Sequence, residues 1–282
     1  VLWTTHVTDA PLPALSLSKD GTLLAVSARN RQGFLYRIDL KGATLMRVFR
    51  ESNITEVLPD KSRVVTYYSN AKFYKLDQPE PVTTLSIPKG LNVGRIRRLD
   101  EDYLTLGGQS KGELDKIVDG KLVPVREWTT GPSAGVSNNG FIAVRKLGKG
   151  SEVFDFMSGE QFLKLDEALT QASVEALGPD KAAVCLNGHD VELWDLKAKK
   201  MLKSIKYPTS VTGMACDKQA KRLVVVDADI RLGAIDVGTW TILWSKKVSD
   251  PGHSQGFRFG RFSIDGRFVL TAADDDTAAV WD

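Results

Sequence analysis

The sequence predicts an all-β fold built from seven similar units, and two recurring features support this. The first is an apolar residue followed by Asp, with steps of 38, 42, 36, 40, 41 and 46 residues between successive Asp positions. The pairs are Ile38-Asp39, Leu76-Asp77, Val118-Asp119, Phe154-Asp155, Trp194-Asp195, Ile235-Asp236 and Trp281-Asp282. A period of about 40 residues that holds four strands is typical of a β-propeller blade. We therefore expect one seven-bladed β-propeller of four-stranded blades.

The second feature is a polar turn that precedes an apolar run in every unit. The turns are Lys19-Asp20-Gly21, Pro59-Asp60-Lys61, Asp100-Glu101-Asp102, Asn138-Asn139-Gly140, Pro179-Asp180-Lys181, Asp217-Lys218-Gln219 and Ile264-Asp265-Gly266. Asp, Asn and Gly suit tight hairpins, because they tolerate left-handed backbone or bond their own backbone. Runs such as 23–26 and 223–226 are apolar on both faces, as strands packed between neighbouring blades should be.

The two ends of the chain are expected to complete the last blade together. The seventh repeat stops one strand short at Trp281-Asp282, while residues 1–7 have no repeat of their own and match residues 242–248 in type, position by position. Pairing the N-terminal segment as the outer strand of blade seven would remove an exposed sheet edge. The alternative is a frayed N-terminal extension. The predicted single domain, residues 1–282, has blades at about 8–50, 51–90, 91–130, 131–168, 169–208, 209–250, and 251–282 plus 1–7.

The last repeat resembles the repeat of the WD-repeat β-propeller family. Gly252-His253, the turn Ile264-Asp265-Gly266, residues 271–277 and Val280-Trp281-Asp282 follow one another in that family's order and spacing. The resemblance implies a structural tetrad of His253, Thr271, Asp275 and Trp281, in which Asp holds His, His meets the Thr hydroxyl, and Thr accepts the indole N–H. Such bonding gives buried polar atoms their partners.

The other repeats match this family less closely. The fifth keeps Trp194-Asp195, but the position expected to carry the hydroxyl is Val184, so no full tetrad is expected there. Repeats one to four and six keep the apolar-Asp pair without Trp. The resemblance therefore covers the whole chain as architecture and only the last blade in detail.

Composition restricts the partners and the location only in part. The net charge of +3 is too small to indicate a nucleic-acid or membrane surface, and no run of 18 apolar residues exists to span a membrane. Cys185 and Cys216 are expected to be apolar structural residues rather than a disulfide, which favours a reducing, cytoplasmic compartment. The chain starts at Val rather than Met, so we expect it to be part of a longer protein. A signal peptide upstream would instead indicate the periplasm or the cell envelope.

The sequence supports a catalytic function less well than a binding function. The segment 234–244 resembles the blade repeat of quinone-cofactor dehydrogenases, but only once, and an outer hairpin explains it equally. The histidines His6, His189 and His253 fall in different predicted blades, so no zinc site is expected. No nucleophile elbow, phosphate loop or dinucleotide fingerprint occurs. A calcium site at the Asp274 to Asp276 turn is an alternative to a solvated acidic turn.

The candidate binding surface is the propeller face formed by loops that join the second and third strands and by links between blades. Its expected basic side carries Arg29, Arg31, Lys111, Lys146 and Lys149, and its acidic side carries Asp227, Asp229, Asp274, Asp275 and Asp276. Such a division would orient a partner with charges of both signs. The alternative is ordinary solubilising charge.

The innermost strands form a second candidate region, the central channel. Its expected residues are Glu56, Arg95, Arg97, Glu175 and Arg258. Arg95 and Arg97 are two positions apart and so point the same way along a strand. They would receive an acidic side chain or a small anion, or else pair with the glutamates or with water.

The sequence thus predicts a non-catalytic scaffold without cofactor or metal, which binds a protein or peptide and no nucleic acid. The leading alternative is a bacterial envelope scaffold similar to cofactor-free quinoprotein-like repeats, followed by a propeller enzyme. The identity of the partner and the oligomeric state are left open.

Overall fold

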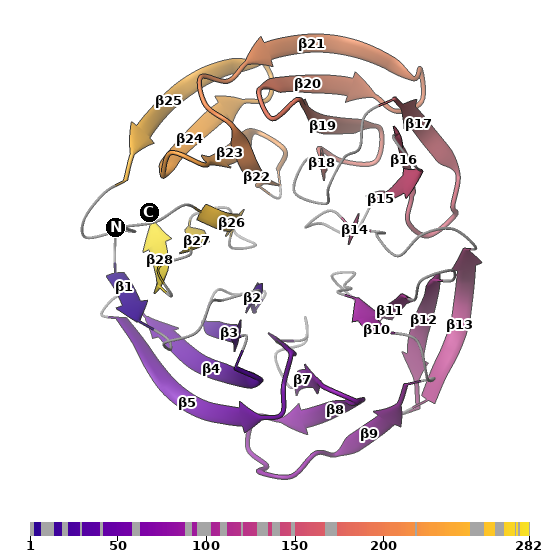
Figure 1. The fold of residues 1–282 in the computed structure, drawn as a ribbon, viewed down its shortest axis with the longest axis vertical. Helices are drawn as coiled ribbons and strands as arrows, with labels where there is room; N and C mark the ends of the chain where they lie inside the picture. The colour runs from indigo at the N-terminus through magenta and orange to yellow at the C-terminus, as the bar shows by residue number, and fades with distance from the viewer. Residues whose placement is uncertain are drawn as a thin grey trace.

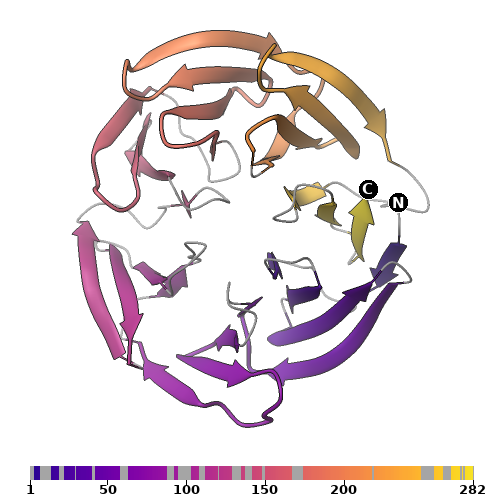
Figure 2. The same ribbon diagram turned by 180° about the vertical axis from the view of Figure 1, so that it is seen from behind.

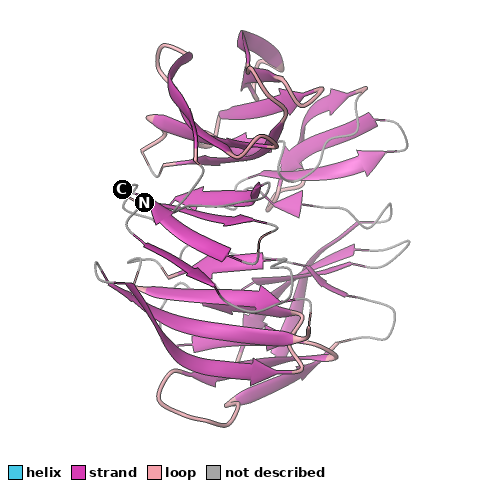
Figure 3. Cartoon of the chain, turned by 60° about the vertical axis from the view of Figure 1, so that its left-hand side comes forward, coloured by secondary structure: helices cyan, strands magenta, loops and turns pink. Residues whose placement is uncertain are grey.

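A computed structural model of the chain describes the protein at residues 3–6, 14–18, 22–28, 30–39, 42–57, 63–87, 92–94, 103–107, 112–119, 121–128, 135–136, 142–147, 150–166, 174–217, 219–248, 257–262, 268–273, 275 and 277–281. All regular structure in these ranges is β-strand, arranged as seven four-stranded antiparallel sheets. Figures 1 and 2 show the sheets following one another around a common centre, with one edge strand of each sheet innermost and the other outermost. Figure 3 shows the same strands in a view turned by 60° from that of Figure 1.

The first three sheets follow the chain without a crossover. Sheet 1 holds β2 (Ala14–Leu17), β3 (Leu23–Ala28), β4 (Gln32–Asp39) and β5 (Gly42–Arg50). Sheet 2 holds β6 (Ile54–Val57), β7 (Arg63–Tyr67), β8 (Asn70–Lys75) and β9 (Thr83–Ser86). Sheet 3 holds β10 (Asn92–Gly94), β11 (Tyr103–Gly107), β12 (Gly112–Val118) and β13 (Lys121–Trp128).

Sheets 4 to 6 repeat this order. Sheet 4 holds β14 (Gly135–Val136), β15 (Ile142–Leu147), β16 (Gly150–Asp155) and β17 (Gln161–Leu165). Sheet 5 holds β18 (Val174–Ala176), β19 (Lys181–Leu186), β20 (Asp190–Asp195) and β21 (Lys200–Lys206). Sheet 6 holds β22 (Val211–Cys216), β23 (Arg222–Asp227), β24 (Arg231–Asp236) and β25 (Thr241–Lys247).

Sheet 7 joins the two ends of the chain. It holds β26 (Phe257–Phe262), β27 (Val269–Ala273) and β28 (Thr277–Trp281), with β1 (Trp3–His6) as its outer strand. β1 runs antiparallel to β28, from Trp3 opposite Val280 to His6 opposite Thr277. This confirms the prediction that the N-terminal segment completes the last four-stranded unit.

Apolar clusters connect each sheet to the next. Leu24, Val26 and Phe34 of sheet 1 pack with Leu270 and Val280 of sheet 7, so the first and last sheets are also in contact. The other junctions hold similar clusters. Because the second strands lie between such clusters, several of them are mostly apolar, and β3 is buried along its whole length.

The recurring Asp has a local structural cause. Asp39, Asp155, Asp195 and Asp236 each accept a hydrogen bond from the backbone N–H three residues later, at the turn between the third and fourth strands. An Asp side chain at the first position of a turn commonly bonds the backbone in this way. Hydrogen bonds to Asp236 lower the pKa of its carboxyl group, and the bond from the Thr239 N–H has the largest effect. The repeat signature is therefore a turn signature in these four units.

The outer strands carry two further regular features that the sequence pattern did not predict. In sheets 1, 3, 4, 5 and 6 the pairing of the third and fourth strands slips by one residue, as at a β-bulge. In sheets 1, 3 and 5 the residue after the slip is a cation that donates to backbone carbonyls in the outer turn of the next sheet. These bonds run from Arg47 to Gln78 and Pro79, from Arg126 to Met157 and Ser158, and from Lys203 to Gly238 and Thr239. We call them the outer latches.

Candidate functional site

Part of the predicted tetrad of the last repeat is present. The Trp281 indole Nε1 donates to Thr271 Oγ1 at 2.7 Å, and both side chains are buried. Thr271 lies on β27 opposite Ala279 of β28, so the side chains meet within one hairpin. The predicted bond between Trp281 and Thr271 is confirmed.

The other two residues of the predicted tetrad are Asp275, which bonds within its own turn, and His253. Asp275 Oδ1 accepts the backbone N–H of Thr277 at 3.1 Å and its hydroxyl at 2.5 Å, which holds the turn between β27 and β28. His253 lies outside the described residues, so its bonds to Asp275 and Thr271 stay predictions. In the fifth repeat Val184 is buried, and the Trp194 indole donates instead to Glu192 at 2.7 Å. The expectation that no full tetrad forms there is confirmed.

One part of the candidate binding face lies where sheets 5 and 6 meet. We define the 5–6 loop surface as residues 187–189, 207–210 and 228–230. Backbone N–H groups of Tyr207 and Val211 donate to the carbonyls of His189 and Gly188, both at 2.7 Å, and Ala228 N–H donates to Ser210 at 2.9 Å. Two turns and the link between them are thus bonded into one continuous surface. Its exposed residues are Asn187, Pro208, Ser210, Ala228 and Asp229.

Asp227 was predicted to be an exposed acidic residue of this face, and that is wrong. Its side chain is fully buried. One carboxylate oxygen accepts the backbone N–H groups of Asp229 at 2.9 Å and Arg231 at 2.8 Å, and the other accepts the Thr209 hydroxyl. Asp227 therefore holds the turn and the link in place, because a buried carboxylate needs such donors. Asp229 is the exposed acidic residue of this turn.

A matching surface lies where sheets 1 and 2 meet. Arg31 is exposed, its guanidinium stands 5.1 Å from the centre of the Tyr68 ring, and its carbonyl accepts the Ser52 N–H at 2.9 Å. The arrangement is a cation–π contact between the turns of neighbouring sheets. Glu51, which is also exposed, follows β5 on the same surface. The described part of the expected basic side thus carries both signs of charge.

Several other predicted face and channel residues cannot be placed. Arg29, Lys111, Lys149, Asp274, Asp276, Arg95 and Arg97 lie outside the described residues. Lys146, Glu56 and Arg258 lie on β15, β6 and β26, and only their backbone is described. Asp275 is half-buried in the turn described above. The predicted charge division and the channel therefore stay predictions at these positions.

Glu175 of the predicted channel is not an open channel residue. It is buried on the innermost strand of sheet 5, and its Oε1 lies 3.4 Å from the backbone N–H of Cys216 on the innermost strand of sheet 6. Between sheets 1 and 2, Ser27 similarly accepts the Thr55 N–H at 2.8 Å. An inner edge strand has unpaired N–H groups. At these two junctions, side chains of the preceding sheet bond to them.

The side chains of both cysteines and of one histidine lie in the described ranges. Cys185 and Cys216 are both free, as expected for structural cysteines. Burial, with Glu175 and Asp217 nearby, raises the pKa of Cys216, which keeps its thiol protonated. His189 Nδ1 lies 3.4 Å from the Tyr207 carbonyl. Within the described part of the chain, no three His, Cys, Asp or Glu residues are grouped as a metal site would require.

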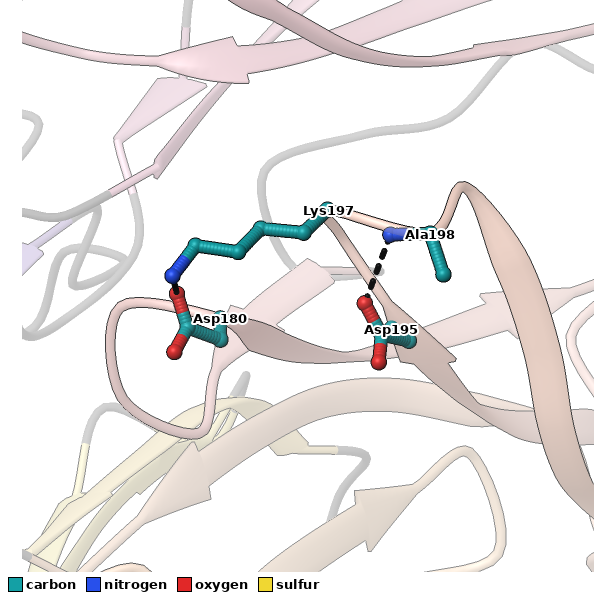
Figure 4. A network of polar contacts seen from close by, with 4 residues as sticks. All are labelled: Asp180, Asp195, Lys197 and Ala198. Atoms are coloured by element: carbon teal, nitrogen blue, oxygen red, sulfur yellow. Dashed lines mark hydrogen bonds and ion pairs between the residues drawn. The ribbon is translucent and has the colours of Figure 1, made fainter.

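The opposite face of the sheets carries an ion pair and a second kind of turn (Figure 4). Lys197 Nζ lies 2.8 Å from Asp180 Oδ1, and Asp195 accepts the Ala198 N–H at 2.8 Å. The Asp180 carboxylate raises the pKa of Lys197, mainly through their hydrogen bond. Lys197 is largely exposed and Asp180 is about half exposed, so this pair contributes little to stability.

Comparison with known proteins does not extend these observations. No family model and no curated protein matches the chain. Among the described residues, no helix has the length and apolar character needed to cross a bilayer.

Proposed function

We propose that the chain is a seven-bladed β-propeller, with a last blade of the WD-repeat type, that acts as a non-catalytic platform for a protein or peptide partner. Seven four-stranded sheets in chain order, apolar clusters between neighbours and a seventh sheet built from both ends of the chain support this architecture. In such a ring, the loops of all blades on one side share a common face.

The 5–6 loop surface carries the functional part of the proposal. Its backbone is held by hydrogen bonds between two turns and a link, so the surface is organised before any partner arrives. Asp227 and Thr209, the polar groups beneath it, are used in holding the turn. The exposed groups are small or polar and stand on a rigid frame, which suits contact with another protein better than bond-breaking chemistry.

The test compares two variants of the chain. Ala228→Arg with Asp229→Lys adds bulk and reverses charge on the 5–6 loop surface without touching buried Asp227. Lys200→Glu with Lys221→Glu reverses charge at two exposed positions on the opposite face, at the start of β21 and in the turn before β23. Proteins enriched on the wild-type chain from a cell extract are identified by mass spectrometry, purified, and measured for direct binding to each variant.

The proposal expects the loop variant to lower the association constant of a directly binding partner at least tenfold, as loss of a central contact does. The opposite-face variant should bind as the wild type does. A partner that binds the loop variant with unchanged affinity, or that is lost equally with both variants, contradicts the proposed surface.

A further inference from the structure

The outer strand of sheet 6 departs from the latch pattern of sheets 1, 3 and 5. After the slip in pairing, Trp244 stands opposite Ala234, in the position held by Arg47, Arg126 and Lys203 elsewhere. In sheet 7 the outer strand is β1, so no turn joins β28 to the outer strand. Trp244 therefore has no outer turn of the next sheet beside it, unlike Arg47, Arg126 and Lys203.

This position leaves a large apolar surface exposed on β25. Trp244 is 41% exposed, and Leu243, at the slip itself, is 51% exposed. Trp240 and Trp281, by contrast, are 4% and 7% exposed. An exposed Trp beside an exposed Leu is the kind of anchor that protein interfaces use.

The charges around this surface are all positive along the strand. Lys246 and Lys247 are exposed, Lys247 lies opposite Arg231 on β24, and residues 241–247 contain no acidic residue. Like charges directly opposite each other are unfavourable in a sheet. A carboxylate placed beside Lys247 at the outer edge would offset this repulsion.

We propose that the outer edge of β25 binds an acidic strand of a partner protein by β-sheet addition. β25 is the last strand of its sheet and has β24 as its sheet partner. Its outward backbone groups can therefore bond an added strand, while Trp244 and Leu243 and the two lysines select the side chains. An antiparallel occupant would read acidic, acidic, any residue, apolar, apolar.

Two other occupants fit the observations less well. A lipid surface would cover the edge backbone with hydrocarbon and leave its polar groups unsatisfied, which is costly. A second copy of β25 would bring two more lysines and no carboxylate to the edge. Charge and edge geometry together favour an acidic strand.

The experiment uses a fluorescently labelled peptide, Glu-Glu-Thr-Val-Ile-Thr, with the full chain and fluorescence anisotropy as the readout. Two controls are the same peptide with Lys in place of Glu and the same peptide N-methylated at alternate residues to block edge bonding. Two variants change the site, Leu243→Ser with Trp244→Ser, and Lys246→Glu with Lys247→Glu. A matched variant on β21, Met201→Ser with Leu202→Ser, removes similarly exposed apolar residues from the neighbouring sheet.

We expect saturable binding of the acidic peptide that weakens about tenfold or more in both β25 variants and not in the β21 variant. The Lys and N-methylated peptides should not bind. Equal weakening by the β21 variant, or binding that survives N-methylation, overturns the proposal. So does binding of the wild type to phosphatidylserine vesicles in place of the peptide, or a dimer in sedimentation equilibrium that becomes monomeric with Trp244→Ser. The Ala228→Arg, Asp229→Lys variant should bind the peptide normally, so this test fails or succeeds separately from that of the 5–6 loop surface.

Discussion

Thr271 is the residue that allows Trp281 to be buried with its indole N–H bonded. Replacing it by Val keeps the shape and removes the acceptor at 2.7 Å. A buried donor without a partner costs about 1 to 3 kcal/mol. We therefore expect Thr271→Val to lower the free energy of unfolding by that amount in urea titration. Thr84→Val, at an exposed position on β9, is the control and should change it by less than about 0.5 kcal/mol. Equal stability of the two variants would contradict the role of Thr271.

Tyr207 links the two sheets beneath the 5–6 loop surface and makes their junction sensitive to alkali. Its hydroxyl donates to Ser245 at 3.2 Å and lies so close to Gly233 that a Cβ there would come within 2.2 Å of it. Burial raises the pKa of Tyr207 above its ordinary value of 10.0. The folded state then holds the proton more tightly than the unfolded state does.

The free energy of unfolding should consequently fall as the pH rises past about 10, because the unfolded chain loses this proton first. Tyr207→Phe should reduce the slope of that fall, measured by urea titrations between about pH 9 and about pH 11. Burial also raises the pKa of Tyr36, so part of the slope should remain. A slope unchanged by the substitution would show that Tyr207 ionises alike in both states.

Asp227 shows why a sequence could not predict the site at residue level. Asp227 and Asp229 are two positions apart in one turn, and their residue type gives no reason to expect different burial. One of the bonds that hold buried Asp227 comes from the hydroxyl of Thr209, 18 residues earlier, and so cannot be read from the turn itself. The predicted Trp281 to Thr271 bond, in contrast, lies within one hairpin, where a local motif is informative.

At the scale of the element, the outer latches join neighbouring sheets near their outer strands. Arg47 donates to Gln78 and Pro79 and stacks 4.8 Å and 4.7 Å from the ring centres of Phe49 and Tyr74. We expect Arg47→Ala to cost about 1 to 2 kcal/mol in thermal or urea unfolding. Arg50→Ala, exposed on the same strand, is the matched control and should lie within about 0.5 kcal/mol of the wild type. Equal losses of stability in the two variants would show that the removal of a positive charge, rather than the loss of the latch bonds, is responsible.

Elements were predictable where the signal is local and not where it depends on pairing between strands. The Asp turns follow from side chains that bond their own backbone, so their spacing located all seven units. The slips in the outer pairs depend on how two strands meet, and no residue type marks them. The latches depend on those slips, because the slip decides which outer-strand residue faces the next sheet.

At the scale of the whole molecule, the junction of sheets 7 and 1 decides whether seven sheets act as one unit. Every other junction lies between sheets that are consecutive in the chain. This one depends on β1 pairing with β28 and on the cluster around Leu24 and Val280. The match between residues 1–7 and 242–248 predicted that pairing, because strands in equivalent positions face equivalent surroundings.

The measurement that tests the proposed ring most directly is a disulfide between its two ends. His6 and Thr277 are opposite each other in the pairing of β1 and β28, and opposite residues in an antiparallel pair stand close enough for a disulfide. In the variant His6→Cys with Thr277→Cys, mild oxidation should link positions 6 and 277 within a single monomeric chain, as detected by mass spectrometry of the digested protein. Thiols that stay unlinked, or a link found only between two chains, would contradict a ring closed by its own N-terminal strand.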